Sequence, residues 1–159
     1  MHRILDILEN NADLTPAEIA VMINSTEQEV AEAIEKYKEE GIILGKKTVI
    51  NWQKTDKEFV TAIIELRVSP QFGKGFDEIA ERLYQYDNVK DVFLMSGAYD
   101  LSLTVEGRTL TDVALFVSEK LAPMEQVIST ATHFVLRRYK HDGILMTKQK
   151  KDDRRVMIL

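Results

Sequence analysis

The sequence predicts an α+β protein with an N-terminal winged helix-turn-helix and a C-terminal ferredoxin-like βαββαβ domain. Three observations lead to this fold class. The first third contains short amphipathic segments that begin with capping boxes. The remainder runs as strand, helix, strand, and then repeats that order. A polar, charged stretch separates the two parts, and 159 residues with 45% hydrophobic side chains suffice for two small domains with real cores.

The charge of the chain is unevenly distributed. Residues 1–50 hold five basic and ten acidic side chains, whereas residues 51–159 hold 16 of each sign, so the net charge of −5 arises in the first third. The absence of cysteine excludes a disulfide scaffold, a thiolate metal site and a cysteine nucleophile. No apolar run approaches the roughly 20 residues of a membrane span, and the N-terminus does not resemble a signal peptide. We therefore expect a cytoplasmic protein without membrane contact.

Three helices are expected in the first third. Residues 2–10 carry apolar side chains at helical spacing. The run from Thr15 to Glu18 begins a second helix, because Thr15 can cap it, proline suits its first position and Glu18 completes a capping box. A second such box, from Thr26 to Glu29, begins the third helix, and Gly41 is placed to end it.

A β-hairpin is expected next, because residues 42–44 and 48–50 are β-rich and flank Gly45-Lys46-Lys47. Two helices joined by a tight turn and followed by a hairpin are typical of a winged helix-turn-helix, whose recognition helix enters the major groove of DNA. Glutamine can bridge two groups of an adenine edge, and lysines can contact phosphates. Each side chain also has an ordinary role as a cap or a solvated group. The candidate DNA-binding residues are Thr15, Ser25, Thr26, Gln28, Lys36, Lys46 and Lys47.

The second part predicts a sheet with two helices. Strands are expected at residues 59–68, 89–95, 99–105 and 127–137, and helices at residues 76–86 and 109–121. This order is that of the split βαβ layout, in which helices cover one face of an antiparallel sheet and leave the other face free. An apolar free face usually packs against a second copy, so we expect a homodimer.

These elements predict the domain boundaries. Residues 1–50 form the DNA-binding domain, residues 51–58 a linker and residues 59–140 the ferredoxin-like domain. Residues 141–159 form a tail with basic side chains and an apolar end, which could lie on DNA, remain solvated or dock on a neighbouring subunit.

A small-molecule site is expected at the connection between the two middle strands, formed by Ser96, Gly97, Ala98, Tyr99 and Asp100. The amides of a tight turn can hold a carboxylate and Asp100 can meet an ammonium group, which suits an amino acid. The alternative is a plain β-turn in which a glycine supplies a positive φ. Hydroxyls of the last strand can add contacts, namely those of Thr130 and Thr132. The three histidines lack metal spacing and no catalytic motif is present, so we expect neither an enzyme nor a cofactor.

Several motifs together resemble the leucine-responsive/asparagine-regulator (Lrp/AsnC) family of transcription regulators. They are the third-helix pattern of Val30, Ile34 and Tyr37 followed by Gly41-Ile42-Ile43, the turn Gly97-Ala98-Tyr99-Asp100-Leu101, and the last strand from Thr130 to Leu136 followed by Arg137, Arg138 and Lys140. The likeness covers about residues 1–140 in one register. It implies DNA binding through the helix-turn-helix, dimers that assemble through the ferredoxin-like domain, often into octamers, and a small effector, usually an amino acid, near the Gly-x-Tyr-Asp turn.

The chain departs from the family pattern in two places. Ala31, Glu32 and Ala33 stand where relatives usually carry arginines, and Ala98 stands where many carry an acidic residue. Two alternatives therefore remain open. One is an effector-binding assembly protein whose helix-turn-helix has lost DNA binding, since several carboxylates together repel phosphates. The other is an enzyme, because the layout also resembles decarboxylases that act on sirohaem, for which only His133, Arg137 and Arg138 could serve here.

Overall fold

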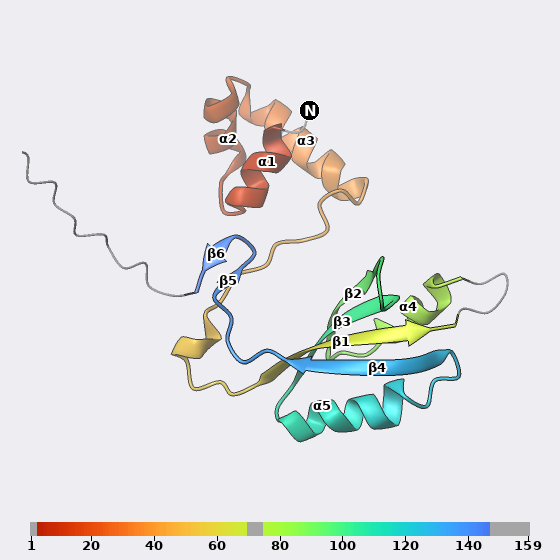
Figure 1. Ribbon diagram of the computed structural model, residues 1–159. Coiled ribbons are helices and arrows are strands. Elements are labelled where there is room, and N and C mark those ends of the chain that lie inside the picture. The colour runs from red at the N-terminus through yellow and green to blue at the C-terminus, as the bar shows by residue number, and fades with distance from the viewer. Residues whose placement is uncertain (1–2, 70–74, 147–159) are drawn as a thin grey trace, which may run out of the picture. The chain divides into compact units, whose positions relative to one another are not determined.

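The protein consists of two compact units, which the computed structural model places at Met1–Val49 and Ile50–Leu159 (Figure 1). The structure describes residues 3–69 and 75–146. The predicted tail lies outside the described residues from 147 onward.

The N-terminal unit is a bundle of three helices, α1 (Arg3–Asn10), α2 (Pro16–Ile23) and α3 (Glu27–Glu39). Both predicted capping boxes are present, at the starts of α2 and α3. The core is small: Ile19, Ala20 and Val30 are buried, and partly buried side chains of all three helices pack around them. This arrangement leaves the N-terminal end of α3 exposed to solvent.

The predicted hairpin after α3 is wrong, because the structure has no strand between residues 42 and 50. The backbone N–H groups of Ile42 and Ile43 instead donate to the carbonyl oxygen of Tyr37, at 2.8 and 3.0 Å. A two-stranded hairpin is marginal in water unless it packs on a third strand or a helix. The side chain of Leu44 is 93% exposed, and those of Ile42 and Ile50 are 50% and 42% exposed, so this segment has little such support. Lys46 and Lys47 therefore lie on an irregular segment rather than at a hairpin tip.

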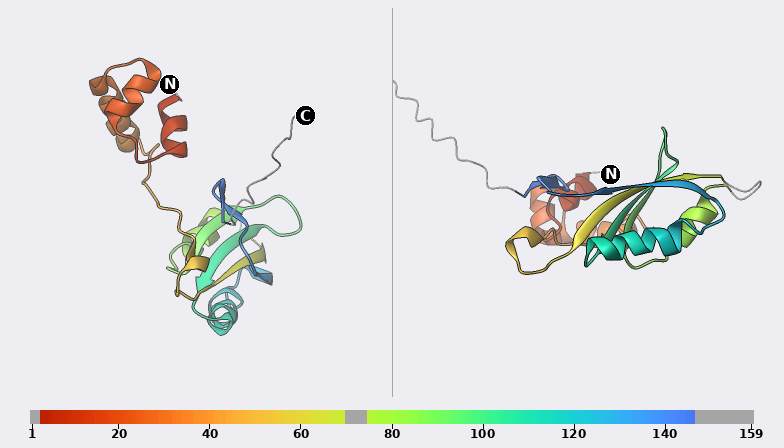
Figure 2. Two further views of the ribbon diagram at one scale, coloured as in Figure 1. Left: turned by 90° about the vertical axis from the view of Figure 1, so that its left-hand side faces the viewer. Right: turned by 60° about the horizontal axis from the view of Figure 1, so that its bottom comes forward.

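The C-terminal unit is a four-stranded antiparallel sheet with helices on one face. Its strands lie in the order β2-β3-β1-β4, with bounds β1 Val60–Val68, β2 Val89–Leu94, β3 Leu101–Gly107 and β4 Val127–Phe134. The helices are α4 (Asp77–Leu83) and α5 (Leu110–Phe116), which continues into the wider turn η2 (Val117–Leu121). Figure 2 shows both helices beneath the same face of the sheet. The order and the two crossovers make this unit a ferredoxin-like βαββαβ domain.

Alternation along the strands separates two faces. On β1 the side chains of Ala62, Ile64 and Leu66 are fully buried and belong to the core that includes residues of α4 and α5. The opposite face is open to solvent and mixed in character. Ile63 and Phe93 on this face are 42% and 52% exposed. A cross-strand hydrogen bond joins His133 Nε2 and Glu65 Oε2 at 3.1 Å.

The segment that follows the N-terminal unit packs on the C-terminal unit. It forms the single-turn helix η1 (Trp52–Lys54), and Asn51 Nδ2 donates to the carbonyl oxygen of Met146 at 2.8 Å. The chain after β4 forms a short hairpin, β5 (Lys140–His141) and β6 (Ile144–Leu145), where the sequence predicts the start of a tail. Its turn places Asp142 and Gly143 at φ values of 44° and 77°, the left-handed region that a type I′ turn requires.

Candidate functional site

The turn between α2 and α3 places the start of α3. Asn24 adopts a left-handed conformation with φ of 56°, which asparagine tolerates better than most residues. Its backbone N–H and that of Ser25 both donate to the carbonyl oxygen of Ala20. The chain therefore reverses within three residues and presents Ser25, Thr26 and Gln28 on the solvent side of α3.

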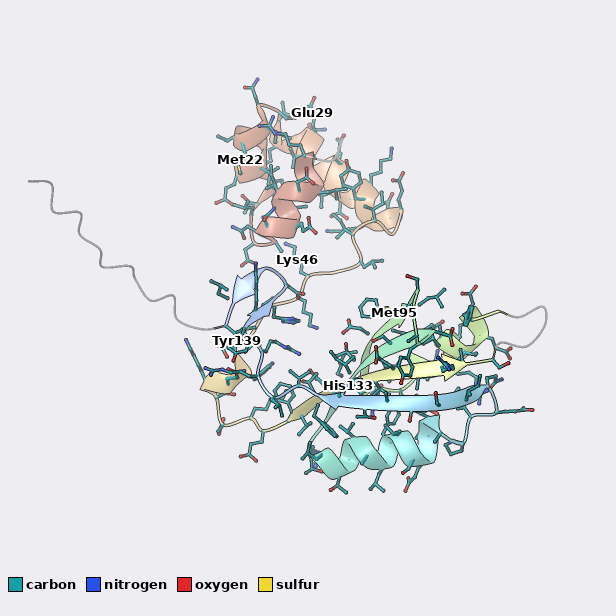
Figure 3. The ribbon with its side chains drawn as sticks, in the orientation of Figure 1. Met22, Glu29, Lys46, Met95, His133 and Tyr139 are labelled. Carbon is teal, nitrogen blue, oxygen red and sulfur yellow. The ribbon has the colours of Figure 1, made fainter. Side chains whose placement is uncertain are left out.

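The carboxylate of Glu29 organises this exposed end (Figure 3). It accepts hydrogen bonds from Ser25 Oγ at 2.6 Å and from the backbone N–H of Thr26 at 3.1 Å. These bonds, with that from Ser25 the largest cause, hold the pKa of Glu29 below its ordinary value. At the start of α2 the backbone and side-chain hydrogen bonds from Thr15 lower the pKa of Glu18 in the same way. Two carboxylates of the acidic unit thus serve as caps beside positive helix ends.

The other predicted DNA-binding side chains are exposed and loosely held. Gln28 Nε2 donates to Glu32 Oε1 at 2.8 Å, and Lys36 Nζ lies 3.8 Å from Glu40 Oε1. Pairs at such exposed positions are weak and exchange easily for another partner. Lys46 and Lys47 are exposed beyond the end of α3. The predicted residues thus occupy the start of α2, the solvent side of α3 and the segment that follows it.

The second predicted site, the turn from Ser96 to Asp100, is tied to the end of β1. Asp100 Oδ2 accepts from the backbone N–H of Val68 at 2.8 Å, and the N–H of Asp100 donates to the carbonyl oxygen of Leu66 at 2.9 Å. Arg67 donates through Nη2 at 2.9 Å and Nε at 3.3 Å to the carbonyl oxygen of Ala98. Met95 directly precedes this turn (Figure 3).

The structure brings one further residue to this turn and places two of the predicted residues on another face of the sheet. Arg67 was not among the predicted residues, although a charged side chain within the apolar run of β1 is a recognisable signal for a special role. Thr130 and Thr132 pair in register with Leu66 and Ile64, so their side chains point to the helix-covered face. Arg67 alternates to the open face, and its side chain donates to the Ala98 carbonyl oxygen. The side chain that holds the turn and the two threonines therefore lie on opposite faces of the sheet.

The described residues hold neither a metal-binding cluster nor a membrane-spanning helix. Residues 3–69 and 75–146 contain no cluster of three metal-ligating side chains. Over the same ranges the structure has no helix with the length and apolarity needed to cross a membrane.

Each of the two units matches a family model of known proteins. The family model described as winged helix-turn-helix DNA-binding matches residues 2–43, and that described as Lrp/AsnC ligand binding domain matches residues 61–145. The chain is 44% identical over 156 residues to an uncharacterized HTH-type transcriptional regulator, YugG, of Bacillus subtilis, covering 98% of this chain and 93% of that protein. It is 28% identical to the HTH-type transcriptional regulator LrpA of Pyrococcus abyssi, covering 86% and 94% of the two chains.

Solved structures share the fold. The structure of AsnC from E. coli superposes with a TM-score of 0.67 at 22% identity, covering 87% of this chain and 91% of that one. A transcriptional regulator from Neisseria meningitidis, NMB0573, solved as a complex with L-Met, superposes with a TM-score of 0.69 at 20% identity, covering 87% and 89%. The matched units, their order along the chain and the similarity to YugG show that the chain belongs to the Lrp/AsnC family of helix-turn-helix transcriptional regulators.

Proposed function

We propose that this regulator contacts duplex DNA through the exposed N-terminal end of α3, with Lys46 and Lys47 on the phosphate backbone. The observation that carries the proposal is the ordered turn that presents Ser25, Thr26 and Gln28 on one surface. A glutamine that leaves Glu32 is free to bridge an adenine edge. The capping role of Glu29 supports the proposal, because the charge of this carboxylate is directed to backbone and hydroxyl donors.

A gel-shift titration on the DNA upstream of the protein's own gene tests this proposal at several salt concentrations. In a variant with Lys46→Ala and Lys47→Ala, we expect weaker binding to all sequences. The slope of log K against log salt should fall by about 1 for each lysine, because each phosphate contact releases counterions. The matched control replaces Lys90 and Lys120, which lie on the other unit, by alanine. An unchanged slope in the first variant would exclude these two lysines from the contact.

A failure of the unmodified protein to bind DNA would favour the main alternative. If it binds no DNA at low salt, with or without amino acids, it is an effector-binding assembly protein.

We propose that the protein acts by binding rather than by catalysis, and that it works in the cytoplasm. A spectral change on addition of a tetrapyrrole would instead favour a sirohaem decarboxylase.

We propose further that the effector is an amino acid held at the turn from Ser96 to Asp100. The relative from Neisseria meningitidis was solved with L-Met, which supports this class of ligand. One oxygen of Asp100 is engaged by Val68, and the carboxylate charge remains available for an ammonium group. The two bonds from Arg67 to Ala98 hold the turn in one conformation, as a preorganised site requires.

A thermal-shift screen with the proteinogenic amino acids tests the effector proposal. A ligand that binds only the native state raises the melting temperature. We expect one or more amino acids to do so, and Asp100→Asn to raise the concentration for half-maximal shift by about tenfold or more, because it removes a charge-assisted contact. The amide oxygen of asparagine can still accept from Val68, so the turn should persist. Asp87→Asn, at an exposed position in the turn before β2, is the control. Equal shifts in both variants would contradict the role of Asp100.

We propose that the open face of the sheet pairs with a second copy to make a homodimer, which can assemble further into an octamer. Ile63 and Phe93 supply apolar contacts on that face, and the hydrogen bond between Glu65 and His133 gives these two polar side chains a partner on the same face. A dimer presents two recognition helices to DNA. Two sites joined in one molecule bind far more tightly than one alone, which compensates for the acidic charge of each unit.

A further inference from the structure

We infer that the C-terminal unit has a second ligand site, a pocket beside η1 that takes a small organic anion with a planar apolar body. This linker pocket has a volume of about 320 Å³, within the range of small-molecule sites. Its walls come from the segment that follows the DNA-binding unit, the start of β1, the chain after β4 and Met146. Figure 1 shows η1, the start of β1 and the hairpin β5–β6 gathered at one end of the sheet.

An aromatic wall forms the apolar side of the linker pocket. The rings of Trp52 and Phe59 meet edge to face, with centroids 6.5 Å apart and an interplanar angle of 88°. Lys57 Nζ lies 4.1 Å from the centroid of Trp52. Aromatic side chains present large contact area with few rotatable bonds, so they suit a planar ligand. The hydrogen bond from Asn51 to Met146 holds this wall against the rest of the unit.

The charged side chains that line the linker pocket determine the sign of the charge that a ligand should carry. The lining contains three cations, Lys57, Arg137 and Arg138, against a single carboxylate, that of Glu58. The guanidinium of Arg137 stacks 5.3 Å from the ring centroid of Tyr139, and Arg138 is a partly buried residue. A planar guanidinium matches a carboxylate or phosphate through two parallel hydrogen bonds. The combination of an aromatic wall and a cationic rim favours an aromatic carboxylate.

The linker pocket is distinct from the Ser96–Asp100 site. Thr61, near the start of β1, lines the pocket, whereas Val68, at the end of the same strand, holds Asp100. At about 3.3 Å per residue, the seven-residue separation places the two sites roughly 20 Å apart. The inference therefore does not rest on the amino-acid effector. An anion bound here would fix residues 50–59, which directly follow the DNA-binding unit. Anion binding would therefore be a second way, besides the amino-acid effector, to change DNA binding.

The fluorescence of Trp52 gives a direct readout, because this residue is the sole tryptophan of the chain. Phenylacetate, benzoate and phenylpyruvate would be titrated into the full-length protein, with excitation of Trp52. Phenylacetamide and phenylethylamine serve as the neutral and cationic counterparts. We expect a saturable change with at least one acid and none with the amide or the amine.

Removing the two arginine charges of the linker pocket tests whether the pocket recognises an anion. Replacing Arg137 and Arg138 by glutamine should raise the dissociation constant of the acid about tenfold or more, because charge-assisted hydrogen bonds are lost. The control variant, Lys90→Gln with Lys120→Gln, removes the same charge outside the linker pocket and should leave the constant unchanged. Asp100→Asn should also leave it unchanged, which separates this site from the effector proposal.

Three results would overturn the inference. One is the absence of a saturable response to any of the three acids. Another is equal binding of the acid and its amide, which would mean that charge is not recognised. The third is a Trp52 emission that changes with protein concentration but not with acid, which would mean that a second copy of the chain covers the linker pocket.

Discussion

Val30→Asp is expected to unfold the DNA-binding unit and abolish DNA binding while the C-terminal unit remains folded. Val30 is 0% exposed and is one of only three buried residues in the core cluster of its unit. A carboxylate there has no partner, and a buried unpaired charge costs more than about 4 kcal/mol, a large part of the stability of any small domain. Because the chain divides at Val49, the loss should stay within residues 1–49.

Circular dichroism, Trp52 fluorescence and a gel shift together measure this outcome. We expect helix signal and DNA binding to fall, whereas the emission of Trp52, which belongs to the second unit, stays the same. The matched control is Val21→Asp, the same chemical change on α2 at a side chain that is 85% exposed. It should keep the helix signal. If Val30→Asp retained a folded N-terminal unit, the small core described above would not be what holds the three helices together.

Aspartate at both Ile63 and Phe93 is expected to convert the proposed homodimer into a monomer. The two side chains lie on the open face of the sheet and are 42% and 52% exposed, so the monomer can carry the charges in water. In a dimer the same charges would be desolvated without partners. Each costs about 2 kcal/mol or more, so the dissociation constant should rise by about a thousandfold.

Analytical ultracentrifugation over a range of protein concentrations measures the change. Leu115→Asp is the control, because Leu115 is 48% exposed but lies on α5 in the helix layer. It should leave the dimer intact. A double variant that still sediments as a dimer would show that the open face of the sheet is not the interface, and would direct attention to the helix layer.

Local patterns predicted the helix starts well and the hairpins poorly. The capping boxes at Thr15 and Thr26 involve residues three positions apart, so their outcome depends little on the rest of the fold. The expected hairpin after α3 failed although its β-rich flanks and turn residues were suitable, and Leu44 within this segment is 93% exposed. The hairpin β5–β6 was missed although its Asp142-Gly143 turn is a strong local signal.

Helix periodicity predicted part of the core of α5. Helical spacing predicts that Leu110, Val113, Ala114, Val117 and Leu121 face the core. The structure buries Val113 and Leu121 as expected and adds Phe116, but it leaves Leu110 55% exposed. The five-residue step from Phe116 to Leu121 follows the wider turn of η2, in which the N–H of Ala122 donates to the carbonyl oxygen of Val117. A period of 3.6 residues cannot predict such a turn, because it arises where the helix end packs on the sheet.

The sequence by itself determined the fold class, the order of the elements and the family likeness, since these depend on caps and periodicities that act within a few residues. Only the tertiary structure decided which distant groups meet. Val68 and Asp100 are 32 positions apart, and Asn51 and Met146 are 95 apart. Such contacts follow from strand register and from the packing of chain ends against the sheet, which no local pattern encodes. For that reason the linker pocket, and the bonds by which Arg67 and Val68 hold the turn from Ser96 to Asp100, appear only in the folded chain.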